Sequence, residues 1–200
     1  MFDISLIVGL PALLLAIVGH EYAHGLVADA LGDPTPRRMG RLTLNPLAHL
    51  DPVGILCLWL LGFGWARPVQ VNPYFFRGNR STGLLLVALA GPFANLTMAW
   101  LGVAVTKALG YSLGLAGTIL FSAFVRYNVN LAVFNLLPVP PLDGWRVVEK
   151  FTRGSWVETV ERYGWVFLLL LLATGGIGRI LGPLAIHVYR LLDLATRWLG

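Results

Sequence analysis

The sequence predicts an all-α polytopic membrane protein with about five to six transmembrane helices, and three observations support this fold class. Of the 200 residues, 56% are hydrophobic and only 12% are charged, about half the charged fraction of an ordinary soluble domain. The mean hydropathy is +0.71. The apolar residues form several blocks that approach the roughly 20 residues needed for one bilayer-crossing helix. We therefore expect residues 1–200 to form a single integral-membrane domain embedded in the lipid bilayer.

The first expected helix covers about residues 4–31 and ends at Gly32-Asp33-Pro34. Pro11 lies near its start, where a membrane helix tolerates a kink. No basic segment precedes the apolar block, no A-x-A-like cleavage site follows it, and it contains His and Glu. We therefore do not expect it to be removed as a signal peptide.

Between this helix and the next full span lies a shorter apolar segment, Pro52–Ala66. Its roughly 15 apolar residues, with three glycines, are too few for a comfortable span. On either side, Arg41–Leu44 and Val69–Asn72 alternate polar and apolar residues with a period of two, which is typical of short half-buried strands. We expect a short membrane-associated β-hairpin or re-entrant segment here.

The next two helices are expected at about residues 82–108 and 113–137. Within the first, Gly91-Pro92 marks a packing or kink site. The second is stopped by Leu137-Pro138-Val139-Pro140-Pro141, because proline removes a backbone donor and favours extended backbone.

The C-terminal part, about residues 160–198, is expected to be helical as well. An amphipathic segment at about 145–162 leads into the apolar run Trp165–Ala173, which ends at Gly175-Gly176. The last block, about 178–198, carries several charged residues and is either a short span or an interfacial helix.

The stretch "GHEYAH", residues 19–24, places polar groups inside the first apolar helix. His20 and His24 are one helical turn apart on the same face, so both rings can reach one ion. H-E-x-x-H is a zinc pattern in which the Glu, here Glu21, acts as general base. Within a bilayer, a cluster of three ionisable groups requires a metal ion or a water-filled cavity to compensate for their burial.

A catalytic zinc ion usually takes three protein ligands, so one more donor is needed. Asp143 fits best, because it follows the proline-rich break in "NLLPVPPLDG" and Gly144 frees the backbone beside it. The other candidates are Asp29, His49, Asp51 and His187.

"HEYAH" and "NLLPVPPLDG" together resemble the H-E-x-x-H and N-x-x-P-x-P-x-L-D-G motifs of the site-2 protease family of intramembrane zinc metalloproteases. The likeness extends over about residues 9–150 and includes "MGRLTLNPLAHLDPVG", "GWARPVQVNP" and "AGPFAN". It implies a minimal member without a PDZ or CBS domain, with a catalytic core at about residues 4–150. It also implies one Zn²⁺ per chain held by His20, His24 and Asp143, and Glu21 as catalytic base. The implied substrates are single-span membrane proteins, cleaved within the bilayer in regulated intramembrane proteolysis.

A single zinc site also constrains the topology. The first helix and the helix at 113–137 must run in the same direction, so with one span between them Pro52–Ala66 should not cross. Most of the basic residues then lie on the zinc-proximal side, which the positive-inside rule assigns to the cytoplasm of a cell-membrane protein. These residues are Arg37, Arg38, Arg41, Arg67, Arg77, Arg80, Arg146, Lys150, Arg153 and Arg162.

Further residues are expected to support the reaction. Asn135 and Asn95 are candidates for stabilising the oxyanion, with interhelical hydrogen bonding as the alternative for each. Val69, Gln70, Val71 and Asn72 could template an extended substrate by strand addition.

The net charge of +5 reflects membrane topology, so no nucleic-acid partner is expected. The single cysteine, Cys57, excludes an intrachain disulfide. A transporter or channel that uses the same intramembrane charges is the alternative function.

Overall fold

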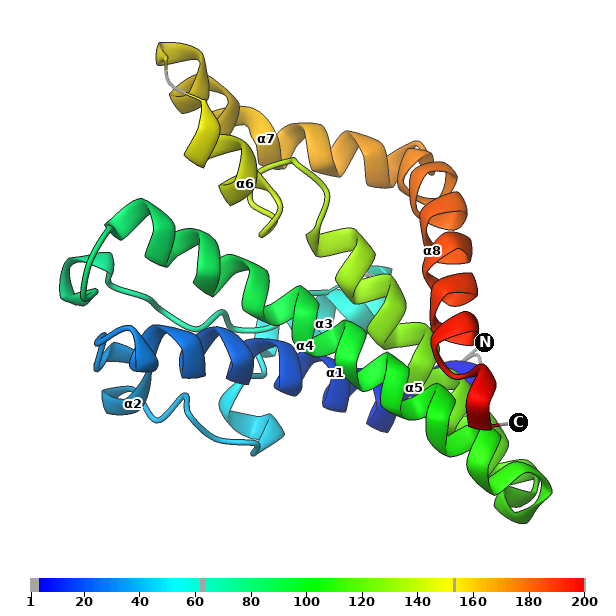
Figure 1. Ribbon diagram of the computed structural model, residues 1–200. Helices are drawn as coiled ribbons and strands as arrows, with labels where there is room; N and C mark the ends of the chain where they lie inside the picture. The colour runs from blue at the N-terminus through cyan, green and yellow to red at the C-terminus, as the bar shows by residue number, and fades with distance from the viewer. Residues whose placement is uncertain (1–3, 62–63, 153, 200) are drawn as a thin grey trace.

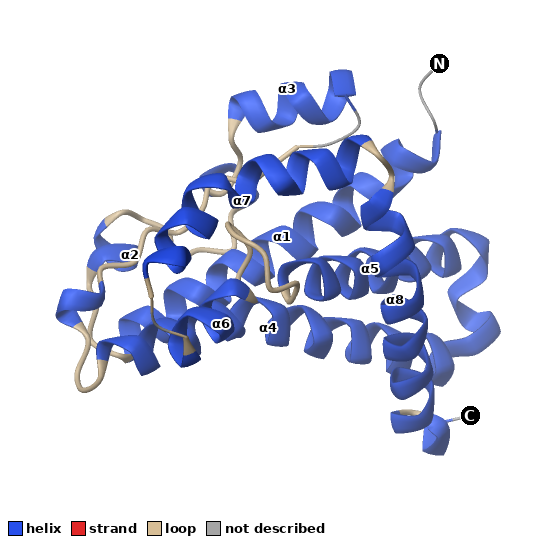
Figure 2. Ribbon diagram, turned by 90° about the horizontal axis from the view of Figure 1, so that it is seen from above, coloured by secondary structure: helices blue, strands red, loops and turns tan. Residues whose placement is uncertain are grey.

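The computed structural model describes residues 4–61, 64–152 and 154–199, and these are mostly helical, with no β-strand among them (Figures 1 and 2). The α-helices of this part of the chain are α1 (Ile4–Ala30), α2 (Thr35–Arg38), α3 (Pro52–Leu61), α4 (Arg80–Leu109), α5 (Gly114–Asn135), α6 (Trp145–Phe151), α7 (Ser155–Ala173) and α8 (Gly176–Ala195). Short 3-10 turns cover η1 (Pro46–Ala48), η2 (Pro73–Phe75), η3 (Gly110–Leu113) and η4 (Arg197–Leu199). The expected all-helical fold class is confirmed.

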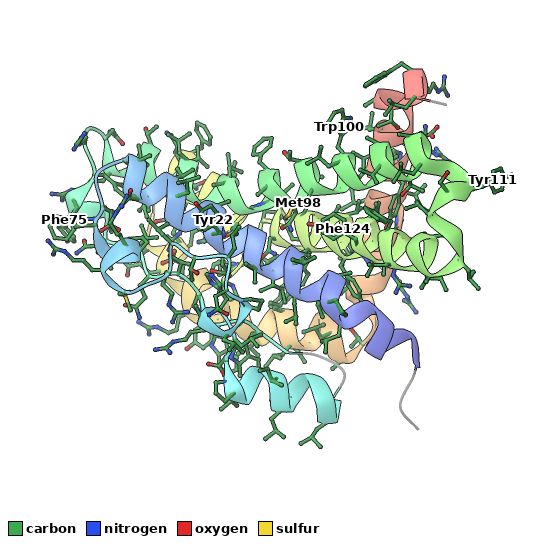
Figure 3. The ribbon with its side chains drawn as sticks, turned by 90° about the horizontal axis from the view of Figure 1, so that it is seen from below. Tyr22, Phe75, Met98, Trp100, Tyr111 and Phe124 are labelled. Carbon is green, nitrogen blue, oxygen red and sulfur yellow. The ribbon has the colours of Figure 1, made fainter. Side chains whose placement is uncertain are left out.

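The centre of the molecule is a bundle of α1, α4 and α5 (Figure 1). α1 and α4 are antiparallel, because His20 contacts Asn95 whereas His24, one turn later, contacts Val87. The two helices approach closely at Gly19, where an added Cβ would lie 2.5 Å from the Cε atom of Met98 (Figure 3). A glycine at this position therefore permits the contact between the helices.

α4 and α5 form an antiparallel hairpin. Asn95 of α4 pairs with Asn128 of α5, and Gly102, further along α4, faces Val125. The chain reverses at η3, which is bounded by Gly110 and Gly114 at φ values of 49° and 61°, a region that favours glycine. Because both α1 and α5 are antiparallel to α4, α1 and α5 run in the same direction, as the expected shared metal site requires.

Two helical stretches are long and apolar enough to cross a membrane, Gly9–Ala30 and Arg80–Asn135. The second contains 56 residues and is the folded α4–α5 hairpin. α7 and α8 meet this test only together, as a pair bent by 84°, so the described chain has two such stretches or up to three. These findings support a membrane protein, and the number of five to six spans stays a prediction.

The segment that contains α3 returns to its starting point. Leu50 and Ala66 form an isolated antiparallel bridge, and the Arg67 amide donates to the His49 carbonyl over 2.8 Å. α3 itself has ten residues, fewer than the roughly 17 that a span needs. This arrangement fits the expectation that the segment does not cross the bilayer.

The described part of the structure does not contain the expected β-hairpin. Neither Arg41–Leu44 nor Val69–Asn72 forms a strand, although both lie beside α1 at Gly25. The amides of Val69 and Asn72 donate instead to the carboxylates of Glu21 and Asp33, over 2.9 and 2.6 Å. Side-chain acceptors on and after α1 thus replace the partner strand that the alternating pattern predicted.

The C-terminal helices differ from the expected segments in one boundary. The amphipathic segment at 145–162 is divided between α6 and α7, with Gly154 at a φ of 144° between them. α8 then crosses α5 and α4, and its buried residues Ala185 and Leu192 join a core with Ala99, Val125, Val129 and Val133. This core lies where α4, α5 and α8 meet.

Candidate metal centre

His20 and His24 form the first part of the site. They lie one turn apart on α1, with ring centroids 4.5 Å apart in an edge-to-face arrangement. Their Nε2 atoms are 2.9 Å apart, and the two residues are only 5% and 9% exposed. The helical spacing predicted from the sequence therefore brings the two ring nitrogens to one point.

Asp143 completes the group from the turn between α5 and α6. Its Oδ2 atom lies 3.1 Å from Nε2 of His20 and 3.3 Å from Nε2 of His24. The turn is closed by a 2.6 Å hydrogen bond from the Gly144 amide to the Asn135 carbonyl. A Cβ on Gly144 would lie 2.2 Å from the Leu136 carbonyl oxygen, so only glycine permits this closure. The proline-rich break thus positions the aspartate beside both histidines.

The hydrogen bonds on the far side of each ring fix its tautomer. His24 Nδ1 lies 2.7 Å from the Val87 carbonyl, which can only accept, so His24 Nδ1 carries the proton. His20 Nδ1 lies 2.6 Å from Oδ1 of Asn95. The Asn95 amide donates to the Ala16 carbonyl and to Oδ1 of Asn128, which leaves its oxygen to accept from His20. In the neutral form of each ring, Nε2 is therefore unprotonated and faces Asp143.

Three acceptors consequently face one another without a donor between them. The two Nε2 atoms and the carboxylate oxygen lie within 4.8 Å of one another, and Asp143 Oδ2 is buried without a hydrogen-bond partner. Such an arrangement is electrostatically unfavourable unless a cation occupies the centre. Two imidazoles and one carboxylate are a typical ligand set of catalytic zinc, with each His held by an outer hydrogen bond. The residues present therefore fit a zinc ion.

Gly91 of α4 provides the space for this group. A Cβ at this position would lie 2.5 Å from His24 Nε2 and 2.6 Å from His20 Nε2. Any side chain larger than hydrogen would therefore occupy the region in which the two ligand atoms converge. The sequence predicts a packing or kink site at Gly91-Pro92. In the structure, Gly91 packs against His20 and His24, the two candidate metal ligands.

Glu21, the expected base, lies between the two histidines in the sequence and is half-buried. Its Oε2 atom accepts a 2.9 Å hydrogen bond from the Val69 amide. It is not part of the three-residue acceptor group. The carboxylate therefore lies where the loop before α4 meets α1.

The other site candidates have different surroundings. Asn95 is fully buried, and its side-chain oxygen accepts a hydrogen bond from His20. Its amide nitrogen donates to the Ala16 carbonyl and to Asn128. Asn95 therefore orients the His20 ring and has no free amide for an oxyanion. The Asn135 amide donates to the Leu131 carbonyl, one turn back in α5. The segment Val69–Asn72 contacts Glu21 through its first residue, as described above.

The remaining metal-ligand candidates are engaged elsewhere. Asp29 pairs with Arg37 over 2.6 Å, and Asp51 accepts from two backbone amides at the start of α3. His187 is exposed and bonds a carbonyl of its own helix. His49 is fully buried in the loop after α2, with Nε2 2.8 Å from the Thr43 carbonyl. Within the described residues, only the predicted trio forms a possible metal group.

An all-helical membrane fold with a buried His-His-Asp zinc site defines the class of membrane-embedded zinc metalloproteases. The chain belongs to Peptidase family M50, the site-2 protease family, whose family model matches residues 103–174, including Asp143. It is 41% identical to "Putative zinc metalloprotease YwhC" of Bacillus subtilis over 175 residues, 81% of this chain and 78% of the relative.

Two proteins named "Putative zinc metalloprotease Rip2" are also similar. The one from Mycobacterium tuberculosis (strain H37Rv) is 33% identical over 79% of this chain and 63% of its own length. The one from Mycolicibacterium smegmatis is 29% identical over 83% of this chain and 66% of its own length. No solved structure matches the chain.

Proposed function

We propose that this protein is an intramembrane zinc endopeptidase that hydrolyses peptide bonds in or near the transmembrane segments of single-span membrane proteins. The observation that carries the proposal is the convergence of three possible ligand atoms, from His20, His24 and Asp143, beside apolar helices long enough to cross a bilayer. Membership of the metalloprotease family supports hydrolysis as the chemistry. Regulated intramembrane proteolysis of such substrates is the proposed role.

The proposed chemistry divides between the ion and the side chains. A bound zinc ion would polarise the scissile carbonyl and lower the pKa of a bound water molecule to about 7. Glu21 then accepts the proton of the attacking water and returns it to the leaving amine. Val87 and Asn95 hold the two imidazoles in the tautomer that leaves Nε2 free for ligation. Asn135, rather than the fully engaged Asn95, remains the candidate for the oxyanion.

The loop at Val69–Asn72 is the proposed site for the substrate backbone. A peptide bond in a helix is hidden by the helix's own hydrogen bonds, so the substrate must be locally extended. The Val69 amide contacts Glu21 directly, and the exposed Gln70 makes no backbone hydrogen bond within the described part of the chain. An extended peptide paired with this loop would therefore lie beside the proposed base.

We also propose that the metal-proximal end faces the cytoplasm of a cell membrane. The loops and short helices near this end carry most of the basic residues, including Arg37 and Arg38 in α2, directly after α1. The opposite end of α4 carries Lys107. This distribution agrees with the positive-inside rule.

The catalytic proposal is tested with purified protein in lipid and a single-span substrate whose products are located by mass spectrometry. Glu21→Gln should abolish cleavage while zinc stoichiometry stays at one per chain, because the carboxylate is outside the ligand group. Asp29→Asn is the matched control, since it alters another carboxylate of α1 that pairs with Arg37. Full activity of the Glu21→Gln protein with zinc bound would refute the assignment, and ion flux without cleavage would favour a transporter.

The substrate loop has a separate test. Gln70→Pro removes an amide that the fold itself does not use, whereas Gln70→Ala retains it. We expect the proline variant to bind zinc normally and to lose cleavage of the membrane substrate. Equal cleavage by both variants would exclude pairing with this loop and leave the metal chemistry unaffected.

A further inference from the structure

α8 has three distinct faces. One face is packed against the bundle and consists of Ile177, Leu181, Ala185, Val188 and Leu192. A second face is apolar but exposed: Ile180, Leu184 and Leu191 are 40%, 44% and 63% exposed. Leu184 and Leu191 follow Ile180 by four and eleven residues, close to one and three helical turns. The three side chains therefore lie on one side of the helix. The exposed apolar face has no partner within the described protein.

The third face is basic. Arg179, Arg190 and Arg197 follow one another at intervals of eleven and seven residues, close to three and two helical turns, so they form one exposed stripe that continues into η4. Within the described residues, Arg179 and Arg190 form no ion pair. Asp193, the acidic residue of α8, is already paired with Lys107 at the end of α4 over 2.7 Å. The stripe therefore keeps its positive charge.

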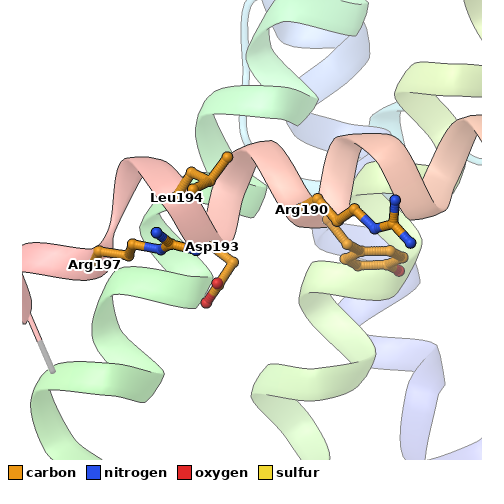
Figure 4. A pocket seen from close by; sticks show the side chains of 5 residues that line it. Arg190, Asp193, Leu194 and Arg197 are labelled. Atoms are coloured by element: carbon orange, nitrogen blue, oxygen red, sulfur yellow. The ribbon is translucent and has the colours of Figure 1, made fainter.

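The basic stripe borders a hollow of about 450 Å³, lined by Tyr189, Arg190, Asp193, Leu194 and Arg197 (Figure 4). Its walls combine the guanidinium groups of Arg190 and Arg197 with the Asp193 carboxylate and apolar surface. Because Asp193 is paired with Lys107, the two guanidinium groups remain to bind a phosphate group attached to hydrocarbon.

The C-terminal end of α8 lies at the end of the bundle remote from the metal centre. α8 is bent by 84° from α7 and runs steeply across the bundle (Figure 1). Its C-terminal end is fixed to Lys107, close to the turn where α4 reverses into α5. Two strongly exposed aromatic residues lie at this end, Tyr111 in the turn (Figure 3) and Trp198 after α8, as is typical of membrane interfaces.

We propose that α8 lies in the plane of the membrane, at the surface remote from the metal centre, and binds the headgroups of anionic phospholipids. The exposed apolar face enters the acyl region, and the arginine stripe with its hollow receives the lipid phosphates. This assignment depends on the geometry of α8 and not on the proposed proteolysis.

The depth of α8 in the bilayer provides the first test. In a Cys57→Ala background, a nitroxide is placed at Ile180 or Leu191 of protein in lipid nanodiscs, and depth is measured from collision with oxygen and a polar nickel reagent. The two positions are about 16 Å apart along the helix. We expect equal shallow depths. Leu86 and Leu101 of α4, both 49% exposed and about 22 Å apart, are the control pair and should differ.

The lipid preference provides the second test. Wild-type protein from equal mixtures of phosphatidylglycerol and phosphatidylcholine should retain phosphatidylglycerol selectively in native mass spectrometry. Arg190→Gln combined with Arg197→Gln should reduce this preference by roughly fivefold per arginine, whereas the two Lys substitutions should preserve most of it. Neither arm requires enzymatic activity.

Three results would overturn the proposal. A difference of about 16 Å in depth between Ile180 and Leu191 would make α8 a transmembrane helix. Labels shielded from both oxygen and nickel would show that protein, a second copy or another partner, covers the face. An unchanged phosphatidylglycerol preference in the Gln variant would exclude the arginine stripe as the headgroup site.

Discussion

Replacing Gly91 with alanine should remove zinc from the protein. The new Cβ would lie 2.5 Å from His24 Nε2 and 2.6 Å from His20 Nε2, whereas ordinary contact begins at 3.4 Å. The rings must therefore retreat by the difference, about 0.8–0.9 Å, but Zn–N bonds near 2.0 Å tolerate only about 0.2 Å. Changing the hydrogen-bond partners of metal ligands lowers metal affinity by roughly 10–100-fold. Direct displacement of two ligands should therefore lower zinc affinity by about 100-fold or more.

The assay is zinc retention during titration with a competing chelator, measured by elemental mass spectrometry on detergent-purified protein. Gly102→Ala is the matched control on the same helix. Its Cβ would meet a methyl group of Val125 at 2.7 Å, an equally tight contact without a metal ligand. We expect that control to lose stability and to keep zinc. Wild-type zinc affinity in the Gly91→Ala protein would refute the proposed position of the ion.

Three further predictions concern the surroundings of the site. Asn95→Leu removes the acceptor for His20 Nδ1 and should lower zinc affinity by roughly 10–100-fold in the same titration, whereas Asn95→Asp keeps an acceptor and should lose less; equal losses would contradict the orienting role. Asp33→Ala leaves two backbone amides without their acceptor, at a cost of about 1–3 kcal/mol, and should speed hydrogen exchange at Asn72; unchanged exchange would show that the contact does not hold the loop. Removing zinc with a chelator leaves three acceptors in contact and should lower the thermal unfolding temperature, with recovery on adding zinc; an unchanged temperature would show that the ion does not stabilise the fold.

The ligand group was predictable because its determinants are local. The four-residue spacing of His20 and His24 fixes their common face, and the prolines before Asp143 indicate where the chain leaves the helix. The role of Asn95 was not predictable in the same way. Its contact with His20 spans 75 residues and depends on the register between α1 and α4, which no local pattern specifies.

The predicted strands show that a local pattern does not identify hydrogen-bond partners that lie far away in the sequence. The alternation at Val69–Asn72 predicts a strand, but the structure forms none there, and the hydrogen-bond partners of this segment are distant residues. Asp33 and Glu21 supply the acceptors, 39 and 48 residues away in the sequence. The break at Gly154 was missed because the amphipathic pattern continues through it.

The separation of the ligands along the chain has a consequence for biosynthesis. His20 and His24 lie in α1, whereas Asp143 lies beyond α5. A growing chain therefore cannot complete its metal centre until Asp143 has been synthesised and the α4–α5 hairpin has assembled against α1. Any chemistry that depends on the ion can consequently begin only after Asp143 has joined the two histidines.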